Sequence, residues 1–528
     1  MRHGNGLQLA GLLAGLALIF GASAAAAADG GGGAAARAGV AGAAGAPNIV
    51  LVVVDDESQG SFNRATLPNL FDRVVAPGTR FDDFALSTPL CCPFRANLLS
   101  GQYGHNNGVL DNDPGYGSLR EKRNVLPAWL RAAGYRTGHF GHYLNGYKQL
   151  HSIADPAPGW GHWQATGGHV YYRYTEGTDH RAQRHLDRPR DHVTSVINRR
   201  AAAWVREETP RARPLYVQID QLAPHLEYGQ RTPGPCEDFA IPQPRDLDLV
   251  AGAPFAHDGA FNEADVSDKP SFVAGLPPLG GAAIERIEQT QRCEFAAMAG
   301  VDRGLKQLLA SFRRAGELRR TAVIYTNDNG FFHGEHRLTN GKVLPYEEAV
   351  RVPLAIRLPG GPRRQGSARV GAPATAVDLA PTILDLAGAR PCAPRLGCRT
   401  LDGRSLLPLL GGDGDAWGAE RAIPLEYRLS GSIGASSCEY HGVRQGTSKW
   451  VEHVSVAPPG GGPCRPASEI EHYELGSDPF ELRNLWPAAA GSARAAKEVR
   501  LRRLASRLSD CAGIRGRDPR PPSGHWCR

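Results

Sequence analysis

The chain has few of the features that mark a membrane protein or a nucleic-acid-binding protein. Beyond its first 28 residues, no apolar run approaches the length of about 20 residues that a bilayer-spanning helix needs. No segment holds enough clustered Lys and Arg to predict nucleic-acid binding, and the formal net charge is only +7. This modest positive charge is compatible with an anionic substrate. No internal repeat is visible, so we do not expect a repeat architecture.

Methionine and aromatic residues are also scarce, with two Met and 7% Phe, Trp and Tyr. By contrast, 64 Gly and 40 Pro predict many loops. The hydrophobic fraction of 41% and the charged fraction of 21% are typical of a globular protein. A chain of 528 residues is too long for one ordinary core, so we expect a large domain and a smaller one.

The N-terminus has the composition of a secretory signal. Arg2 and His3 precede an apolar stretch, Leu7–Phe20, that is short for a membrane span and is followed by small residues. We predict a signal peptide over residues 1–28 and a Gly/Ala-rich linker over residues 29–46, with an uncleaved anchor as the alternative. The protein is then expected to be secreted, with no membrane contact after cleavage.

The ten cysteines fit an exported protein. Cys91 and Cys92 are adjacent, and the eight that remain are an even number, which favours disulfides in an oxidising compartment. Sequence does not fix connectivity, so several pairings remain open. Nearness along the chain favours the pairs Cys392–Cys398, Cys438–Cys464 and Cys511–Cys527, which leaves Cys236 with Cys293.

Apolar, β-branched runs have the pattern of strands that are buried on both faces, and they are Ile49–Val54, Pro214–Asp220 and Thr321–Thr326. Helical segments lie between and after them, over Asn124–Ala133, Thr194–Glu208, Ile284–Arg314 and Ala376–Gly388. This alternation predicts an α/β domain with a large, mostly parallel sheet flanked by helices. Ligands usually bind at the carboxyl ends of such strands.

A loop rich in Gly and Asp, Gly411–Asp415, marks the expected domain boundary. We therefore predict a large domain over residues 47–415, which would carry the site, and a smaller α+β domain over residues 416–528. Short segments of alternating pattern predict an antiparallel sheet in the smaller domain, followed by one helix. These segments are Gly442–Arg444, Lys449–Val454 and Ile470–Leu475, and the helix is Ala493–Leu508.

Two pairs of oxygen ligands follow two of the predicted strands. Asp55 and Asp56 are adjacent carboxylates that repel one another, so a cation is their natural partner. Asp328 and Asn329 follow another strand end. Four oxygen donors without a His or Cys ligand suit Ca²⁺ or Mg²⁺ better than zinc. Ordinary polar loop residues are the alternative for either pair taken alone.

The stretch Cys91-x-Pro93-x-Arg95 and the residues after it, 96–103, resemble the signature of type I sulfatases. For this motif taken alone, a buried cysteine pair beside a turn proline is the alternative. Four further segments resemble the same family in the same order, namely Pro47–Asp56, Asp220–His225, Phe261–Pro270 and Asn327–Lys342. Phe261–Pro270 is similar to the branch that contains N-acetylglucosamine-6-sulfatase and related arylsulfatases.

The resemblance implies an alkaline-phosphatase-like fold and a nucleophile that the gene does not encode. In that family the cysteine at the position of Cys91 is oxidised to formylglycine by a formylglycine-generating enzyme. One hydroxyl of the hydrated aldehyde, bound to the metal, attacks sulfur, and loss of a proton from the other releases sulfate. The implied metal ligands are Asp55, Asp56, Asp328, Asn329 and the modified Cys91.

The resemblance also assigns the cationic and histidine side chains. Pro93 predicts the first turn of a helix, with Cys91 just before it and Arg95 one turn into it. Arg95 would hold the formylglycine hydroxyl and the carboxylates of the metal site. His225 and Lys342 match the residues that contact sulfate. His105, His333 and His336 lie near these motifs and are further candidates for the pocket.

One position departs from the family pattern. In the segment Gly138–Tyr147, His142 stands where the family has a lysine that bridges sulfate and the formylglycine hydroxyl. Histidine is shorter and can be neutral at pH 7. We hypothesise that His142 still donates to sulfate or accepts the proton in the release step, with activity favoured on the acid side. A weakened or inactive homologue is the alternative.

The sequence therefore predicts a secreted enzyme that hydrolyses aryl sulfates or sugar sulfates, small or glycan-borne. Two rival functions remain. One is hydrolysis of phosphate monoesters or phosphonates on the same fold, and the other is binding of sulfated glycans without catalysis. The leaving group is not readable, because specificity comes from loops such as Trp160–Asp179 and from the smaller domain.

Overall fold

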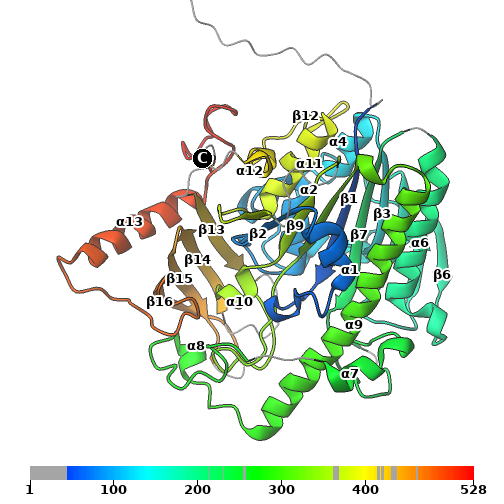
Figure 1. The fold of residues 1–528 in the computed structure, drawn as a ribbon. Coiled ribbons are helices and arrows are strands. Elements are labelled where there is room, and N and C mark those ends of the chain that lie inside the picture. Colours follow the sequence, from blue (N-terminus) through cyan, green and yellow to red (C-terminus); the bar gives the residue numbers. More distant parts are fainter. Residues whose placement is uncertain are drawn as a thin grey trace, which may run out of the picture. The chain divides into compact units, whose positions relative to one another are not determined.

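A sheet of ten strands runs through the centre of the protein, in the order β10-β2-β9-β8-β1-β7-β3-β4-β5-β6 (Figure 1). In its middle, β8 (Thr321–Asn327), β1 (Asn48–Asp55), β7 (Leu215–Pro224), β3 (Arg136–His142) and β4 (His162–Thr166) are all parallel. The predicted mostly parallel sheet is confirmed. The outer strands are β2 (Thr79–Phe81), β5 (Thr175–Thr178), β6 (Arg181–Arg184), β9 (Leu354–Arg357) and β10 (Ala368–Val370).

The structure is a computed structural model that describes residues 45–211, 213–229, 231–253, 257–360, 368–412, 417, 421–429, 437–458 and 462–527. The predicted signal peptide and nearly all of the predicted linker lie outside the described residues, as does most of the predicted boundary loop. Residues 42–528 form one compact unit. The division at residue 415 stays a prediction.

Helices cover both faces of the sheet. The alternating residues of β1 explain the two layers, because Ile49, Leu51 and Val53 belong to one core and Val50 and Val52 to the other. The first core is completed by α2 (Cys91–Ser100), α4 (Leu126–Ala132) and α11 (Leu379–Ala387). The second is completed by α6 (Val193–Glu208) and α9 (Gly281–Arg314), which lie side by side in Figure 1.

The C-terminal part is an antiparallel sheet with one helix, as predicted, but the sheet has four strands where three were expected. Its strands are β13 (Ala422–Arg428), β14 (Ser437–Gln445), β15 (Ser448–Val456) and β16 (Arg465–Glu474), and its helix is α13 (Ala493–Leu508). Sequence analysis missed β13. A buried ion-pair cluster fixes this sheet to the rest of the unit, since Arg444 and Lys449 both contact Glu347.

The remaining elements are short. They are α1 (Pro68–Leu70), α3 (Gly104–Asn107), α5 (Tyr147–Leu150), α7 (Asp248–Gly252), α8 (Ser271–Ala274), α10 (Glu347–Val350), α12 (Leu407–Gly411), β11 (Cys392–Ala393) and β12 (Gly397–Cys398). All four disulfides form with the favoured pairing. Cys91 and Cys92 are free and buried.

Candidate active site

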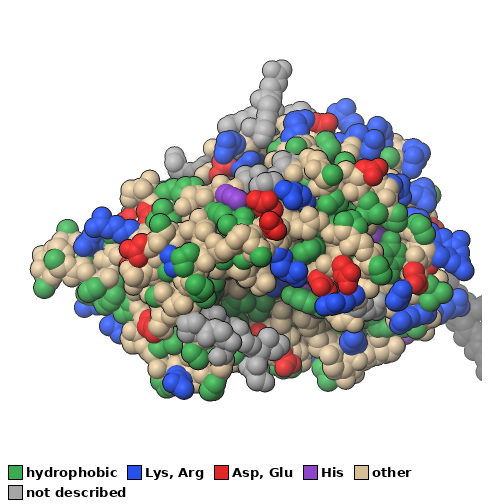
Figure 2. Space-filling view, turned by 90° about the horizontal axis from the view of Figure 1, so that it is seen from below, with side chains coloured by type: hydrophobic (Ala, Val, Ile, Leu, Met, Phe, Trp, Pro, Cys, Tyr) green, Lys and Arg blue, Asp and Glu red, His purple; other side chains and the backbone are tan. Residues whose placement is uncertain are grey.

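The carboxyl ends of the central strands gather four acidic side chains at one edge of the sheet. Asp55 ends β1, Asp328 follows β8, and Asp220 lies in β7 beside Val53. Together with Asp56, these carboxylates are buried. The strand ends point to the lower edge in Figure 1, and Figure 2 looks onto that edge, where the surface is hollowed near its centre. Parallel strands therefore bring together residues that are far apart in sequence.

The backbone at Asp56 explains how two adjacent carboxylates face one cation. Successive residues of an extended strand point to opposite faces. Asp56 instead adopts φ of 69°, a left-handed conformation that is uncommon outside glycine. Its carboxylate thereby reaches the Lys342 ammonium, which also lies 3.9 Å from Asp55 Oδ1. Strained backbone of this kind is often found at functional sites.

Cys91 is the first residue of α2, one position further into the helix than predicted. Leu90, which precedes the helix, provides no side-chain cap. The Cys91 thiol donates to Asp55 Oδ1 at 3.6 Å and accepts from Lys342 Nζ at 3.0 Å. Burial and the charge of Asp55 raise the pKa of the thiol well above its ordinary value. The unmodified side chain is therefore a neutral thiol at pH 7.

Arg95 ties the three strand ends together from one turn inside α2. Its guanidinium lies 3.1 Å from Asp55, 3.1 Å from Asp220 and 2.8 Å from Asp328. It also donates to the backbone oxygen of His142 at 2.9 Å. The planar fork suits this arrangement, because it can serve several oxygens at once in a buried site. Arg95 is thus the internal counterion of the carboxylate cluster.

The donor set fits a hard divalent cation. Four buried carboxylates face two permanent cations, so the cluster has room for further positive charge. Asp56 Oδ2 and Asn329 Oδ1 are buried and accept no hydrogen bond from the part of the chain that the structure describes. Bare, buried oxygens of this kind need a partner. Asp55, Asp56, Cys91 and His225 offer ligand atoms within 4.8 Å of one another.

His225 adds a second indication of a cation. Its Nδ1 donates to the Leu226 carbonyl at 2.6 Å, so a neutral ring carries a lone pair on Nε2. Burial lowers the pKa of His225, which favours that neutral form. Nε2 lies 3.5 Å from Asp56 Oδ2. Two acceptors that face one another in this way are arranged as ligands of one cation, or share a proton.

His142 lies at the end of β3 and lines a neighbouring cavity of about 300 Å³ together with His169. The His169 ring lies 4.6 Å from the rings of both His142 and His225. His142 Nδ1 is buried without a hydrogen-bond partner among the described residues. Burial, followed by the neighbouring His169 and Arg95, lowers the pKa of His142 well below its ordinary value.

A glycine fixes the position of His142. Gly141 has φ of 118°, and a Cβ atom there would lie 1.8 Å from the Asp220 backbone oxygen. Only glycine permits this conformation and this close approach of β3 to β7. The packing therefore determines where the histidine side chain enters the site.

The carboxylates of the site differ in the direction of their pKa shifts. Burial and the neighbouring Asp56 raise the pKa of Asp55 to about 6, and burial and Asp55 raise that of Asp328 to about 7. Burial also acts on Asp56, but Lys342 and His225 outweigh it and lower its pKa to about 2. Without a further cation, the cluster therefore favours partial protonation at neutral pH.

The predicted site residues converge in space. Asp55, Asp56, Cys91, Arg95, His225, Asp328, Asn329 and Lys342 form one contiguous cluster, and His142 joins it through its backbone. Sequence analysis missed Asp220 and His169 as site residues. Asp220 closes a strand run that had been recognised, whereas His169 lies in the Trp160–Asp179 segment and carried no signal. His105, His333 and His336 pair with Glu426, Glu294 and Glu263 instead.

Comparisons with known proteins show which family this chain resembles. The family model described as Sulfatase matches residues 47–389. An arylsulfatase of Volvox carteri is 31% identical over 498 residues, which cover 88% of this chain and 75% of that protein. An N-acetylglucosamine-6-sulfatase of Capra hircus is 27% identical over 512 residues, which cover 90% of this chain and 85% of that protein.

A solved structure described as a complex with its substrate D-glucosamine-2-N,6-O-disulfate superposes with a TM-score of 0.68 at 23% identity. The match covers 87% of this chain and 97% of that chain, and it supports the fold. Some relatives are named extracellular sulfatases, such as one of Drosophila melanogaster that is 32% identical over 69% of this chain and 31% of that protein.

Proposed function

The chain belongs to the sulfatase family, an α/β family of sulfuric ester hydrolases, and we propose that it hydrolyses aryl or sugar sulfates with a formylglycine made from Cys91 and a divalent cation. The observation that carries this proposal is the position of Cys91. Its Sγ lies at the start of a buried helix, between Asp55 at 3.6 Å and Lys342 at 3.0 Å. A nucleophile at this atom would stand beside both the carboxylate cluster and a cationic donor.

The cation would be held by Asp55, Asp56, Asp328 and Asn329, together with the modified Cys91. We propose Ca²⁺, with Mg²⁺ as the alternative, because the free donors are oxygens. When bound, it would polarise the sulfate oxygens and lower the pKa of the attacking hydroxyl. The formylglycine would supply, as its hydrate, that hydroxyl and a second one whose deprotonation frees the sulfate.

The other side chains would place charge around the reacting sulfate. Lys342 would donate to the oxygen of the leaving alcohol and stabilise its developing negative charge. His225 would donate to a sulfate oxygen from Nε2, the ring atom that now faces Asp56, only when the ring is protonated, because in the neutral ring this atom carries a lone pair. Arg95 would hold the carboxylates in position, because it already contacts three of them. These groups are in place before substrate arrives, which lowers the reorganisation that the reaction requires.

His142 would accept or donate a proton near the sulfate. Since its pKa is lowered, the ring is neutral at pH 7 and can act as the base in the release step. The neutral ring also carries one N–H that can donate a hydrogen bond to sulfate, whereas action as a general acid would require protonation at acidic pH. The unpartnered Nδ1 supports a position that faces the substrate.

We propose that the protein is exported and matured by a formylglycine-generating enzyme. Four disulfides fit an oxidising compartment. Within the described ranges, no helix is both long and apolar enough to cross a bilayer. The predicted signal peptide, the linker and the division into residues 47–415 and 416–528 belong to the same proposal.

The test is turnover of a chromogenic aryl sulfate and the matching aryl phosphate, in calcium, by protein made with a formylglycine-generating enzyme. We expect sulfate hydrolysis, lost by about 10³-fold or more in Cys91→Ala because the nucleophile is removed. Preference for phosphate would favour a phosphomonoester or phosphonate hydrolase. No turnover of aryl or sugar sulfates, with the aldehyde at Cys91 confirmed by peptide mass, would favour a glycan-binding role.

A further inference from the structure

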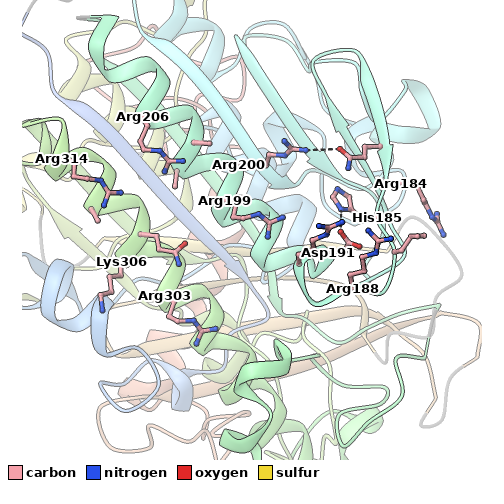
Figure 3. A pocket seen from close by; sticks show the side chains of 17 residues that line it. Arg184, His185, Arg188, Asp191, Arg199, Arg200, Arg206, Arg303, Lys306 and Arg314 are labelled. Atoms are coloured by element: carbon pink, nitrogen blue, oxygen red, sulfur yellow. Dashed lines mark hydrogen bonds and ion pairs between the residues drawn. The ribbon is translucent and has the colours of Figure 1, made fainter.

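A basic groove lies on the outer side of α6 and α9. It encloses about 1010 Å³, and nine of its lining side chains are Arg or Lys against one carboxylate, Asp191. Figure 3 labels most of these cations, which come from three parts of the chain. The members used below are Arg184 and Arg188 from β6 and the following loop, Arg199 and Arg206 from α6, and Lys306 and Arg314 from α9.

The charges in this groove lack internal partners. Across the described ranges, no carboxylate forms an ion pair with any of those six exposed side chains, whereas two other lining residues are paired, Arg200 with Glu176 and Arg303 with Asp246. Exposed arginines elsewhere do find partners, as the Arg369–Asp82 and Arg428–Glu439 pairs show. In Figure 2, Lys and Arg gather along the edge of the molecule on the α6 side. Clustered like charge repels itself, so an anion there would be strongly favoured.

The helices build an elongated floor for the groove. They approach closely where Asn198 donates to the Gly300 carbonyl at 3.0 Å, and a Cβ atom on Gly304 would lie 2.1 Å from the Asn198 side chain. Small side chains, Ala203 and Ala310 among them, lie between the cations. From Lys306 to Arg314 the α9 axis advances about 12 Å at 1.5 Å per residue. The groove thus suits an extended row of anions better than a single one.

One end of the groove lies at the same sheet edge as the candidate active site. The register pairs His142 with Thr166, Thr166 with Glu176, and Glu176 with Gln183, which lines the groove. Three strand spacings of about 4.8 Å separate His142 from Gln183, or roughly 14 Å. A linear polymer with one sulfate in the active site can therefore continue into the groove.

We propose that the basic groove is a second binding site for a linear sulfated polysaccharide, which it holds while the active site acts on one sulfate group. Arginine forks bind sulfate oxygens in pairs, which matches the composition of the groove. The lining contains no Phe, Tyr or Trp, so it lacks the stacking surfaces that single-stranded nucleic acids use. The choice of a sulfated chain over other polyanions rests on the proposed function.

The test measures binding of dextran sulfate to full-length Cys91→Ala protein, which cannot turn substrate over. The variant Arg206→Gln/Lys306→Gln/Arg314→Gln removes three exposed, unpaired cations. We expect the Kd to rise about tenfold and the slope of log Kd against log salt to fall by about 2–3, since each cation releases counterions from the polymer. The matched control is Arg494→Gln/Arg500→Gln/Arg503→Gln on α13, which has the same net charge and should change Kd by less than about twofold.

A second measurement tests whether the groove contributes to substrate binding during turnover. In active enzyme, the ratio of KM for a sulfated polymer to KM for an aryl sulfate should rise about tenfold in the groove variant and not in the α13 control. Equal effects of the two variants on Kd or on the KM ratio would refute the proposal that the groove binds the polymer. If single-stranded DNA of matched charge binds as tightly as dextran sulfate and loses as much affinity in the groove variant, the groove is a polynucleotide site instead. Loss of all sulfate turnover would refute the proposed function alone, because the Cys91→Ala binding result does not depend on it.

Discussion

The candidate active site and the basic groove both collect like charges from elements that are distant in sequence, but they balance them in opposite ways. In the active site, buried carboxylates are held by Arg95 and Lys342 inside the protein. In the groove, Arg206 and Arg314 are exposed, and within the described residues no carboxylate pairs with them. Burial explains the contrast, since an unpaired buried charge costs several kcal/mol while water screens an exposed one.

This contrast predicts that the two sets of charges affect different properties, folding stability for the active site and ligand binding for the groove. Charges of the active site should contribute to folding as well as catalysis, because removing one leaves its partners buried and unpaired. Charges of the groove should contribute to ligand binding and little to folding. Two predictions compare buried charges of the active site directly with exposed charges, and two more test a buried pair elsewhere and a neutral side chain of the active site.

Arg95→Ala should destabilise the protein by about 3–5 kcal/mol, because Asp55, Asp220 and Asp328 lose their common counterion. Urea unfolding followed by fluorescence measures this free energy. The control is Arg428→Ala, which removes an exposed pair with Glu439 and should cost at most about 1 kcal/mol. A similar loss of unfolding free energy in both variants would contradict the claim that only the buried charges of the active site stabilise the fold.

Calcium should stabilise the protein through the active site alone. At 100 times the Kd, one bound ion adds about 2.7 kcal/mol to the free energy of unfolding, and a chelator should remove this gain together with activity. Asp56→Asn should abolish the calcium-dependent rise in Tm, while the groove variant should retain it. An equal calcium-dependent rise in Tm in Asp56→Asn would show that the ion binds elsewhere.

His105 provides a buried pair away from both regions. Burial lowers its pKa, but Glu426 at 2.7 Å outweighs this and raises it to about 9. Because the folded pKa exceeds the ordinary value of 6.5, the stabilisation is complete below pH 6.5 and is lost as pH rises through 9. We expect a loss of about 2–3 kcal/mol over this window, absent in His105→Gln. Unfolding at pH 6 to 9 tests it, and a pH-independent difference between the two proteins would contradict it.

His142→Lys should change rate more than stability. The substitution restores the cation of the family pattern beside sulfate but removes a neutral ring that can accept a proton. We expect kcat/KM for an aryl sulfate to fall about tenfold near pH 7, because lysine is protonated there and cannot accept the proton in the release step. Rates from pH 5 to 9 give the profile. An unchanged rate and profile would show that His142 takes no part in the reaction.

Much of the fold could be predicted because local pattern and burial agreed. The run Ile49–Val54 became β1 with alternate residues in two cores, and Ala493–Leu508 became a helix with the predicted bounds. Short loops made three of the disulfides the simplest pairs, and Cys236–Cys293 followed by elimination. By contrast, β13 was missed; it is an edge strand that contains Pro424, and a proline inside a run is a signal against a strand.

The sequence by itself determined the chemistry of the site, because adjacent carboxylates, a Cys-x-Pro-x-Arg motif and strand-end polar residues are local patterns. Only the tertiary structure decided which further residues join it. Asp220 pairs with Arg95 through the register of β7, and His169 enters by the path of a loop. The groove depends on α6 packing against α9, about a hundred residues apart in sequence, where an Asn–Gly contact sets the spacing of the two rows of cations. Long-range packing of this kind leaves no periodic trace in a sequence, since each helix alone presents only an ordinary solvated face.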